Sequence, residues 1–248
     1  MKRRLSTVIA FATCVLPAGC GSTRIIETSS DKGPGQLHSR GLCTPSSTAP
    51  TPATELIADF SSAGGVVGGQ GNAIPARIIT YGLPKSVDPA SHAYTTTGGN
   101  LNIQINAPAV ARPQMLGTVI QFDSCIDASQ FTGVQFAASG SFSGCSLVYA
   151  SGDVEHEDAT KSSTFASGPE GSYSPQHKIG ADDLGSTPRT IKLPFARTDI
   201  EGNPPTPLDP AKLIFTLWQF VVPVAADDGS ATPPCLANLT IGDIKFYR

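Results

Sequence analysis

An acidic segment is the first place where this sequence could carry chemistry. The letters GDVEHEDAT place four carboxylates and one histidine within residues 152–160. Such carboxylates could ligate a hard cation, and His156 could join them around a transition metal. Glu155 and Glu157 could instead serve a hydrolase as a carboxylate pair. The segment has neither EF-hand nor H-E-x-x-H spacing and lacks an E-x-D-x-x-E order, so a solvated acidic loop is favoured.

Two further segments resemble catalytic motifs only superficially. In GSFSG (140–144) a phenylalanine, Phe142, occupies the position of the nucleophilic serine. The glycine-rich stretch 63–71 lacks the Gly-Lys-Ser/Thr ending of a phosphate-binding loop. His38, His92 and His177 lie in polar contexts and are expected at the surface. The residues therefore predict no reaction.

The elements that must position any site are predicted to be strands. Charged residues make up only 15% of the chain, whereas it contains 25 Gly and 21 Pro, which favours strands joined by turns. Alternating patterns recur, and no helical apolar period persists. The predicted fold class is all-β, a two-sheet antiparallel sandwich or jelly roll. The expected strands are 56–60, 76–82, 100–106, 118–123, 133–139, 145–151, 189–195, 212–222 and 238–247.

The first residues have the anatomy of a secretory signal. Lys2, Arg3 and Arg4 precede a short apolar stretch that ends in LPAGC, and this ending resembles a bacterial lipobox. Cys20 would then be lipidated. Because Pro17 stands where the lipobox prefers leucine, ordinary cleavage and secretion stay open. We expect a signal peptide at 1–19, a Ser/Thr/Pro-rich tether at 20–54 and one domain at 55–248.

Four segments, in this order, resemble a known family. CIDASQFTGVQFAASG, TIKLPF, LDPAKLIFTLWQF and LTIGDIKFYR are similar to galactose-binding-like jelly rolls, near the family 11 carbohydrate-binding modules and related bacterial lipoproteins. The resemblance covers roughly residues 55–248 and implies a non-catalytic sugar-binding domain. Related jelly rolls often hold a structural Ca²⁺ between the first and last strands, which implies Asp59 and Asp243 as ligands. Gly242 departs from the pattern, since an aspartate often stands there.

Aromatic and amide side chains suggest where a sugar would bind. An aromatic ring can cover the apolar face of a pyranose, and amides can bind its hydroxyl groups. Strand alternation places Gln121 and Gln135 away from the inferred core. If these faces coincide on a concave sheet, Trp218, Tyr149, Gln121 and Gln135 form a binding platform. The alternative is that Trp218, the one tryptophan of the chain, belongs to the core, as a lone Trp in an apolar strand usually does.

Four cysteines remain once Cys14 leaves with the signal and Cys20 carries lipid, so two disulfides are expected. Three pairings are possible. If successive predicted strands alternate in direction, Cys125 and Cys235 lie at one end of the sandwich, and Cys43 and Cys145 at the other. We therefore predict Cys125–Cys235 and Cys43–Cys145, because a strand is too long for a disulfide to bridge its ends. An error in the direction of one strand would reverse this choice.

The leading hypothesis is a lipid-anchored protein of the bacterial cell envelope that displays one carbohydrate-binding domain. Gly21 after the lipidated cysteine resembles outer-membrane sorting, and a secreted product is the alternative location. The second hypothesis is an adhesion or scaffold lipoprotein that uses the sandwich for protein contacts, and the third is the hydrolase considered above. The net charge of −3 and pI of about 5.8 exclude a basic footprint for nucleic acid.

Overall fold

The computed structural model describes residues 50–61, 66–67, 74–83, 92–110, 114–153, 176–196, 208–226 and 231–248. These residues form strands and two short 3₁₀ turns, η3 (Ala181–Asp183) and η4 (Pro210–Lys212). Within these ranges there is no helix of the length and hydropathy needed to span a membrane.

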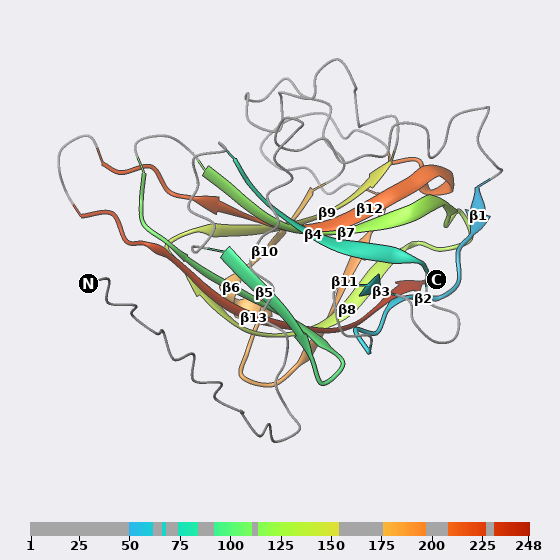
Figure 1. Cartoon of the computed structure of the whole chain (residues 1–248), viewed down its shortest axis with the longest axis horizontal. Coiled ribbons are helices and arrows are strands. Elements are labelled where there is room, and N and C mark those ends of the chain that lie inside the picture. Colours follow the sequence, from blue (N-terminus) through green and yellow to red (C-terminus); the bar gives the residue numbers. More distant parts are fainter. Residues whose placement is uncertain are drawn as a thin grey trace, which may run out of the picture.

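Two sheets face each other (Figure 1). The β7 sheet has the order β10 (Gln176–Ile179), β9 (Ser146–Asp153), β12 (Leu213–Val222), β7 (Gln114–Asp127), β4 (Ala76–Leu83) and β3 (Val66–Val67), with β1 (Thr51–Pro52) beside β7. The β8 sheet has the order β11 (Arg189–Pro194), β8 (Gly133–Ser143), β13 (Cys235–Tyr247), β6 (Asn100–Ala107) and β5 (His92–Thr97), with β2 (Leu56–Ala58) beside β13. β1 pairs with β7 in parallel, and the other strand pairs are antiparallel.

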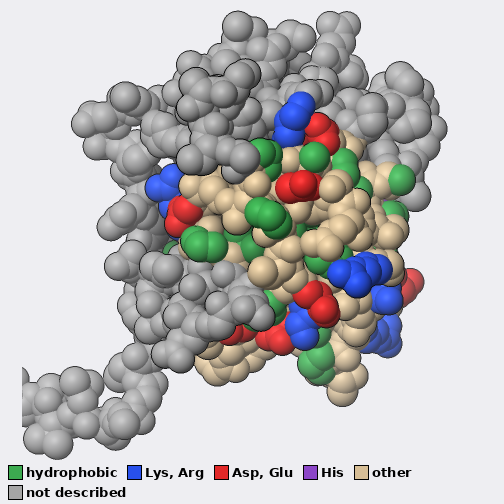
Figure 2. Space-filling view, turned by 90° about the vertical axis from the view of Figure 1, so that its right-hand side faces the viewer, with side chains coloured by type: hydrophobic (Ala, Val, Ile, Leu, Met, Phe, Trp, Pro, Cys, Tyr) green, Lys and Arg blue, Asp and Glu red, His purple; other side chains and the backbone are tan. Residues whose placement is uncertain are grey.

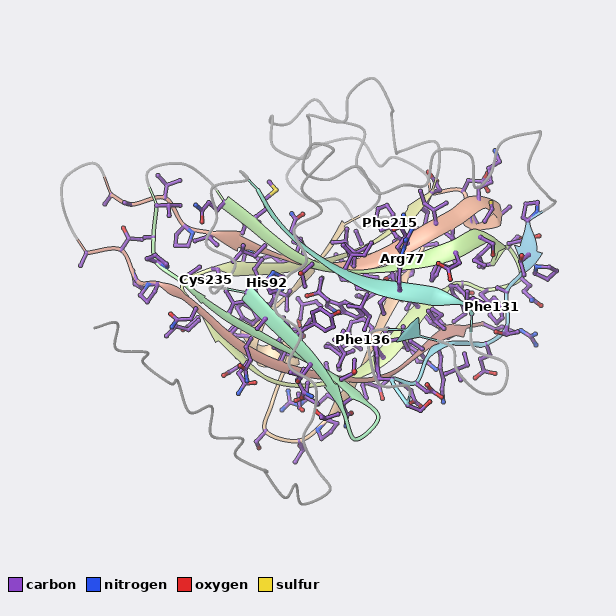
Figure 3. The ribbon with its side chains drawn as sticks, viewed as in Figure 1. Arg77, His92, Phe131, Phe136, Phe215 and Cys235 are labelled. Carbon is purple, nitrogen blue, oxygen red and sulfur yellow. A yellow bond between two sulfur atoms is a disulfide. The ribbon has the colours of Figure 1, made fainter. Side chains whose placement is uncertain are left out.

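The core lies between the sheets because alternate side chains of each strand point inward. Val134, Phe136 and Ala138 of β8 are buried there, and Figure 3 shows Phe136 between the two layers. Trp218 of β12 crosses Phe136 edge to face, with ring centroids 5.3 Å apart. Such a pair adds a directional contact to the burial of apolar area.

The predicted sandwich is confirmed, and each of the nine predicted strands overlaps an observed one. Four strands were missed. β1 and β3 have two residues each, β10 has four, and β5 has the sequence HAYTTT, so none carries a strong apolar alternation. β1 also shows that the sheet includes residues before the expected domain start at 55: the backbone N–H of Ala53 donates to the carbonyl oxygen of Asp127.

The predicted disulfide pairing is wrong. Cys145 is bonded to Cys235, with 5.0 Å between their Cα atoms. β8 and β13 are antiparallel neighbours, so the end of β8 lies beside the start of β13. The missed strand β10 explains the error, because one additional strand reverses the direction expected for every strand after it. Cys125 is also disulfide-bonded. Cys43, whose predicted partner was Cys145, lies outside the described residues.

Two histidines expected at the surface are buried. His92 of β5 and His177 of β10 are 1% and 6% exposed. The Nε2 atom of His92 lies 3.0 Å from the Thr118 hydroxyl oxygen. The Nε2 atom of His177 lies 2.8 Å from the carbonyl oxygen of Pro194. Both rings are held by hydrogen bonds inside the sandwich, which a polar sequence context does not reveal.

Candidate functional site

The predicted aromatic platform is not formed, because Trp218 and Tyr149 point into the core. They are 0% and 1% exposed, and their ring centroids are 5.6 Å apart. Neither ring has a face open to a sugar. Strict alternation along β12 would place Ile214 on the same strand face as Trp218, but Ile214 belongs to a cluster on the other side of the sheet. A register shift between Leu213 and Phe215 breaks the alternation on which that expectation rested.

The Tyr149 hydroxyl group belongs to a buried polar cluster. It contacts Ser151 at 3.2 Å and accepts a hydrogen bond from the Thr216 hydroxyl. Burial raises the pKa of Tyr149 to about 12, and the hydrogen bonds to Ser151 and Thr216 partly oppose that rise. The phenol therefore stays neutral and has a structural role between the sheets.

The two predicted glutamines lie on opposite outer faces of the sandwich. Gln121 belongs to the β7 sheet, and Gln135 to the β8 sheet. Both point away from the core, as their strand alternation predicts, but they cannot bind one small ligand together. Gln135 lies between Lys192 and Lys245 in the cross-strand register. Gln121 belongs to a cross-strand row of residues that forms the candidate site.

Gln121 lies at the centre of a cross-strand row on the outer face of the β7 sheet. The register places Arg77 of β4 on one side of it and Phe215 of β12 on the other. Gly152 of β9 follows Phe215, and a Cβ at Gly152 would overlap the Phe215 ring. The ring thus occupies the space that the glycine leaves. Figure 3 shows Arg77 and Phe215 on this outer side of the sheet.

We call this site the Gln121 face, defined by Arg77, Gln121, Phe215 and the adjacent apolar side chains Val119 and Leu217. Val119, Phe215 and Leu217 form a second apolar cluster, separate from the core between the sheets. Gln121 is 1% exposed, whereas Arg77 is exposed. Arg77 therefore connects a buried amide to the surface. Arg77 and Phe215 were not predicted as site residues, because an alternating strand pattern indicates a face but not the neighbour on the next strand.

Gln121 has a hydrogen-bond donor without an acceptor. Its Oε1 atom accepts from the Arg77 Nε–H group over 3.2 Å. Its Nε2 atom is buried and has no hydrogen-bond partner among the described residues. Leaving a buried donor unsatisfied costs about 1–3 kcal/mol. A ligand hydroxyl oxygen at this point would accept from Gln121, while the exposed guanidinium group of Arg77 supplies further donors.

Of the residues expected to bind calcium, Asp59 directly follows β2 and Asp243 lies on the neighbouring strand β13, but each has another partner. The Oδ1 atom of Asp59 accepts hydrogen bonds from the backbone and hydroxyl of Ser61. Asp243 lies 3.5 Å from the Lys245 ammonium group. No group of three potential ligating side chains occurs within the described ranges. Two carboxylates are fewer donors than Ca²⁺ takes, so carbonyl groups or waters would have to complete the site. Calcium stays a prediction.

The acidic segment is described only at its start. Asp153 ends β9 and is fully buried, and its Oδ2 atom accepts from the backbone N–H of Asp209 at 2.6 Å. This carboxylate fixes the turn that precedes η4. Glu155, His156 and Glu157 lie outside the described residues, as do the signal segment and Cys20.

The described residues form a β-sandwich with one mixed apolar and polar row on an outer sheet face, and such a fold does not by itself define a function. No family model matches the sequence, and the comparison with curated proteins finds no match. Among solved structures it is similar to a family 11 carbohydrate-binding module of Clostridium thermocellum in complex with a β-1,3-1,4-mixed-linked tetrasaccharide. That pair has 16% identity and a TM-score of 0.39, over 78% of this chain and 94% of the other.

A second solved structure is the family 11 module of the cellulosomal cellulase Lic26A-Cel5E of the same organism. It has 15% identity and a TM-score of 0.38, over 79% of this chain and 96% of the other. Both solved structures are of the family that the sequence segments resemble. At this identity and TM-score the likeness assigns no ligand to this chain.

Proposed function

We propose that this chain is a non-catalytic, lipid-anchored protein of the bacterial envelope whose β-sandwich binds carbohydrate at the Gln121 face. One observation carries the proposal: a buried amide donor without an acceptor lies between an exposed guanidinium group and an aromatic ring. The Arg77 guanidinium group is the exposed donor of this row, and a sugar hydroxyl beside it could accept from the Gln121 Nε2 group. Phe215 is only 4% exposed, so it packs beside Gln121 rather than against the sugar. The exposed Arg77 side chain marks where the ligand would reach Gln121.

A glycan array with the oxidised protein tests this proposal, followed by titration calorimetry with the oligosaccharide that it selects. Arg77→Ala and Gln121→Ala should each weaken binding by roughly tenfold, because each removes a hydrogen bond to the ligand. Lys178→Ala is the matched control: Lys178 is exposed on the edge strand β10 of the same sheet, and β9 separates it from β12. A folded protein that binds no glycan on the array would refute the proposal.

The anchor is a separate part of the proposal and has its own test. Cys20 would carry the lipid and residues 20–54 would separate the membrane from the sandwich. In a bacterial host grown with a labelled fatty acid, wild-type protein should take up label and sediment with membranes. Cys20→Ser should abolish both. Label in the Cys20→Ser protein, or release of the unlabelled wild-type protein into the medium, would contradict lipid anchoring and leave secretion as the location.

A further inference from the structure

The two outer faces of the sandwich differ in character. On the β7 sheet, the outward side chains around Gln121 are mostly apolar and buried. On the β8 sheet, the outward side chains of β6, β13 and β8 are exposed or half-exposed. Toward one end of this second face they are amides and hydroxyls. Its basic side chains Lys192 and Lys245 flank Gln135, further along the strands.

Six of these uncharged side chains form two cross-strand rows, which we call the amide–hydroxyl face. The strand register gives the rows Asn102–Thr240–Ser139 and Gln104–Asn238–Ser141. Neighbouring strands are about 4.8 Å apart, and alternate residues along a strand are about 6.8 Å apart. The face is therefore a regular array of hydrogen-bonding groups across three central strands.

Part of this array is held in place by its own hydrogen bonds. The Thr240 hydroxyl donates to the Asn102 Oδ1 atom at 3.0 Å. The Asn102 amide nitrogen donates in turn to the Thr97 hydroxyl of β5 at 3.1 Å. These bonds fix Asn102 and Thr240 of the first row, so a ligand would not have to order those two side chains.

The second row keeps its hydrogen-bonding capacity for a partner. Gln104, Asn238 and Ser141 are exposed. Each amide has both a donor and an acceptor, and so does the serine hydroxyl. Beside Asn238 on the same strand face lies Leu236, a large apolar side chain that is 45% exposed. Exposed sheet faces usually carry charges that maintain solubility, and these rows carry none.

We propose that the amide–hydroxyl face is a second binding surface, and that its ligand is a neutral polysaccharide. A charged polymer would find no opposite charge on these rows to offset its desolvation. A neutral polysaccharide has hydroxyl groups that donate and accept, in step with the amides, and C–H surface for Leu236. The contacts are exposed and individually weak, so binding requires an extended chain that engages both rows at once.

Affinity electrophoresis of the full chain tests the surface, in gels that contain either a soluble neutral β-glucan or polygalacturonate. The neutral polymer should retard the protein, and polygalacturonate should not. Gln104→Ala/Asn238→Ala should lower retention roughly tenfold, since two hydrogen-bonding side chains are lost. Thr190→Ala is the control, because Thr190 is exposed on the edge strand β11 of the same sheet. Circular dichroism checks that each variant is folded.

Placing both sets of changes in one protein separates this surface from the Gln121 face. In a Gln121→Ala background, polymer retention should persist and then disappear with Gln104→Ala/Asn238→Ala. If Gln121→Ala alone abolishes retention, the second surface is refuted and the proposed function stands. If the amide changes abolish retention and Gln121→Ala also leaves the affinity for the array-selected oligosaccharide unchanged, the Gln121 site is refuted instead. A concentration-dependent dimer in sedimentation, dissociated by the amide changes, would replace the polysaccharide with a second copy of the chain.

Discussion

Gln121 is the residue on which the binding site depends, and its burial gives a prediction about stability. Replacing it by methionine keeps much of the side-chain volume and removes the unsatisfied Nε2 donor. Arg77 loses its acceptor, but water can replace it because the guanidinium group is exposed. We expect Gln121→Met to raise the free energy of unfolding by about 1 kcal/mol in urea titrations. A decrease of that size would mean that the amide stabilises the fold.

His177 predicts a pH dependence of stability. Burial lowers its pKa from the ordinary 6.5, and the hydrogen bond to the Pro194 carbonyl group partly opposes this shift. The unfolded chain therefore binds a proton first as the pH falls. Stability is retained above pH 6.5 and decreases below it, by at most about 1.4 kcal/mol per pH unit. His177→Gln should flatten that decrease in unfolding titrations between neutral and acidic pH. An unchanged slope in the variant would contradict this role.

At the residue scale, sequence patterns gave the outward direction of Gln121 and Gln135 correctly, because a strand alternates with a period of two. Alternation does not show which sheet each strand joins. The predicted platform required both glutamines on one face, and the structure places them on different sheets. Trp218 illustrates the opposite limit. Trp218 is 0% exposed, which supports its alternative assignment to the core. Trp218→Ala would therefore remove about 3–5 kcal/mol of stability rather than report on a ligand.

At the scale of the strands, Gly152 links β9 to the candidate site. The Phe215 ring of β12 occupies the space above this glycine. Gly152→Ala should push the ring away, weaken glycan binding roughly fivefold, and cost about 1–3 kcal/mol of stability through overpacking. Calorimetry and urea unfolding measure the two effects. Gly185→Ala, between η3 and β11, is the control, because its Cβ would meet only the flexible Arg189 side chain, at 3.4 Å. Wild-type affinity in Gly152→Ala would exclude Phe215 from the site.

The disulfide ties the end of β8 to the start of β13. Cys145 and Cys235 are 90 residues apart in the chain, so the bond closes a long loop and restricts the unfolded state. The Cys145→Ser/Cys235→Ser protein should lose roughly 2–5 kcal/mol of unfolding free energy. The measurement is urea unfolding without reductant. Adding reductant to the wild type should give a comparable or larger loss, since Cys125 is also disulfide-bonded. Equal midpoints for variant and wild type would contradict a stabilising bond.

The errors made from the sequence also belong to the scale of the strands. The nine predicted strands are long enough to show an alternating pattern, whereas β10 has four residues. One missed strand reversed the expected direction of β11, β12 and β13, and with it the disulfide pairing. The register shift in β12 likewise moved Ile214 to the other face. Strand existence follows from local patterning, but direction and register depend on every strand before them.

At the scale of the whole molecule, the sandwich presents two faces with different chemistry. The β7 sheet carries an apolar outer face with one buried amide row, and the β8 sheet carries the exposed amide–hydroxyl rows. In Figure 2, basic and acidic side chains lie interspersed with uncharged ones at the end of the sandwich that includes the C-terminus. Charged residues make up only 15% of the chain, and this composition predicted the all-β class. The position of a site could not be predicted, because it depends on which strands become neighbours.

Calorimetric titration of the array-selected oligosaccharide into wild-type and Gln121→Met protein tests the central claim most directly. Binding should be saturable in the wild type and at least roughly tenfold weaker in the variant, while the variant is as stable as the wild type or more so. That combination assigns the buried amide to ligand recognition. Equal affinity in both proteins, with the fold intact, would contradict carbohydrate binding at the Gln121 face.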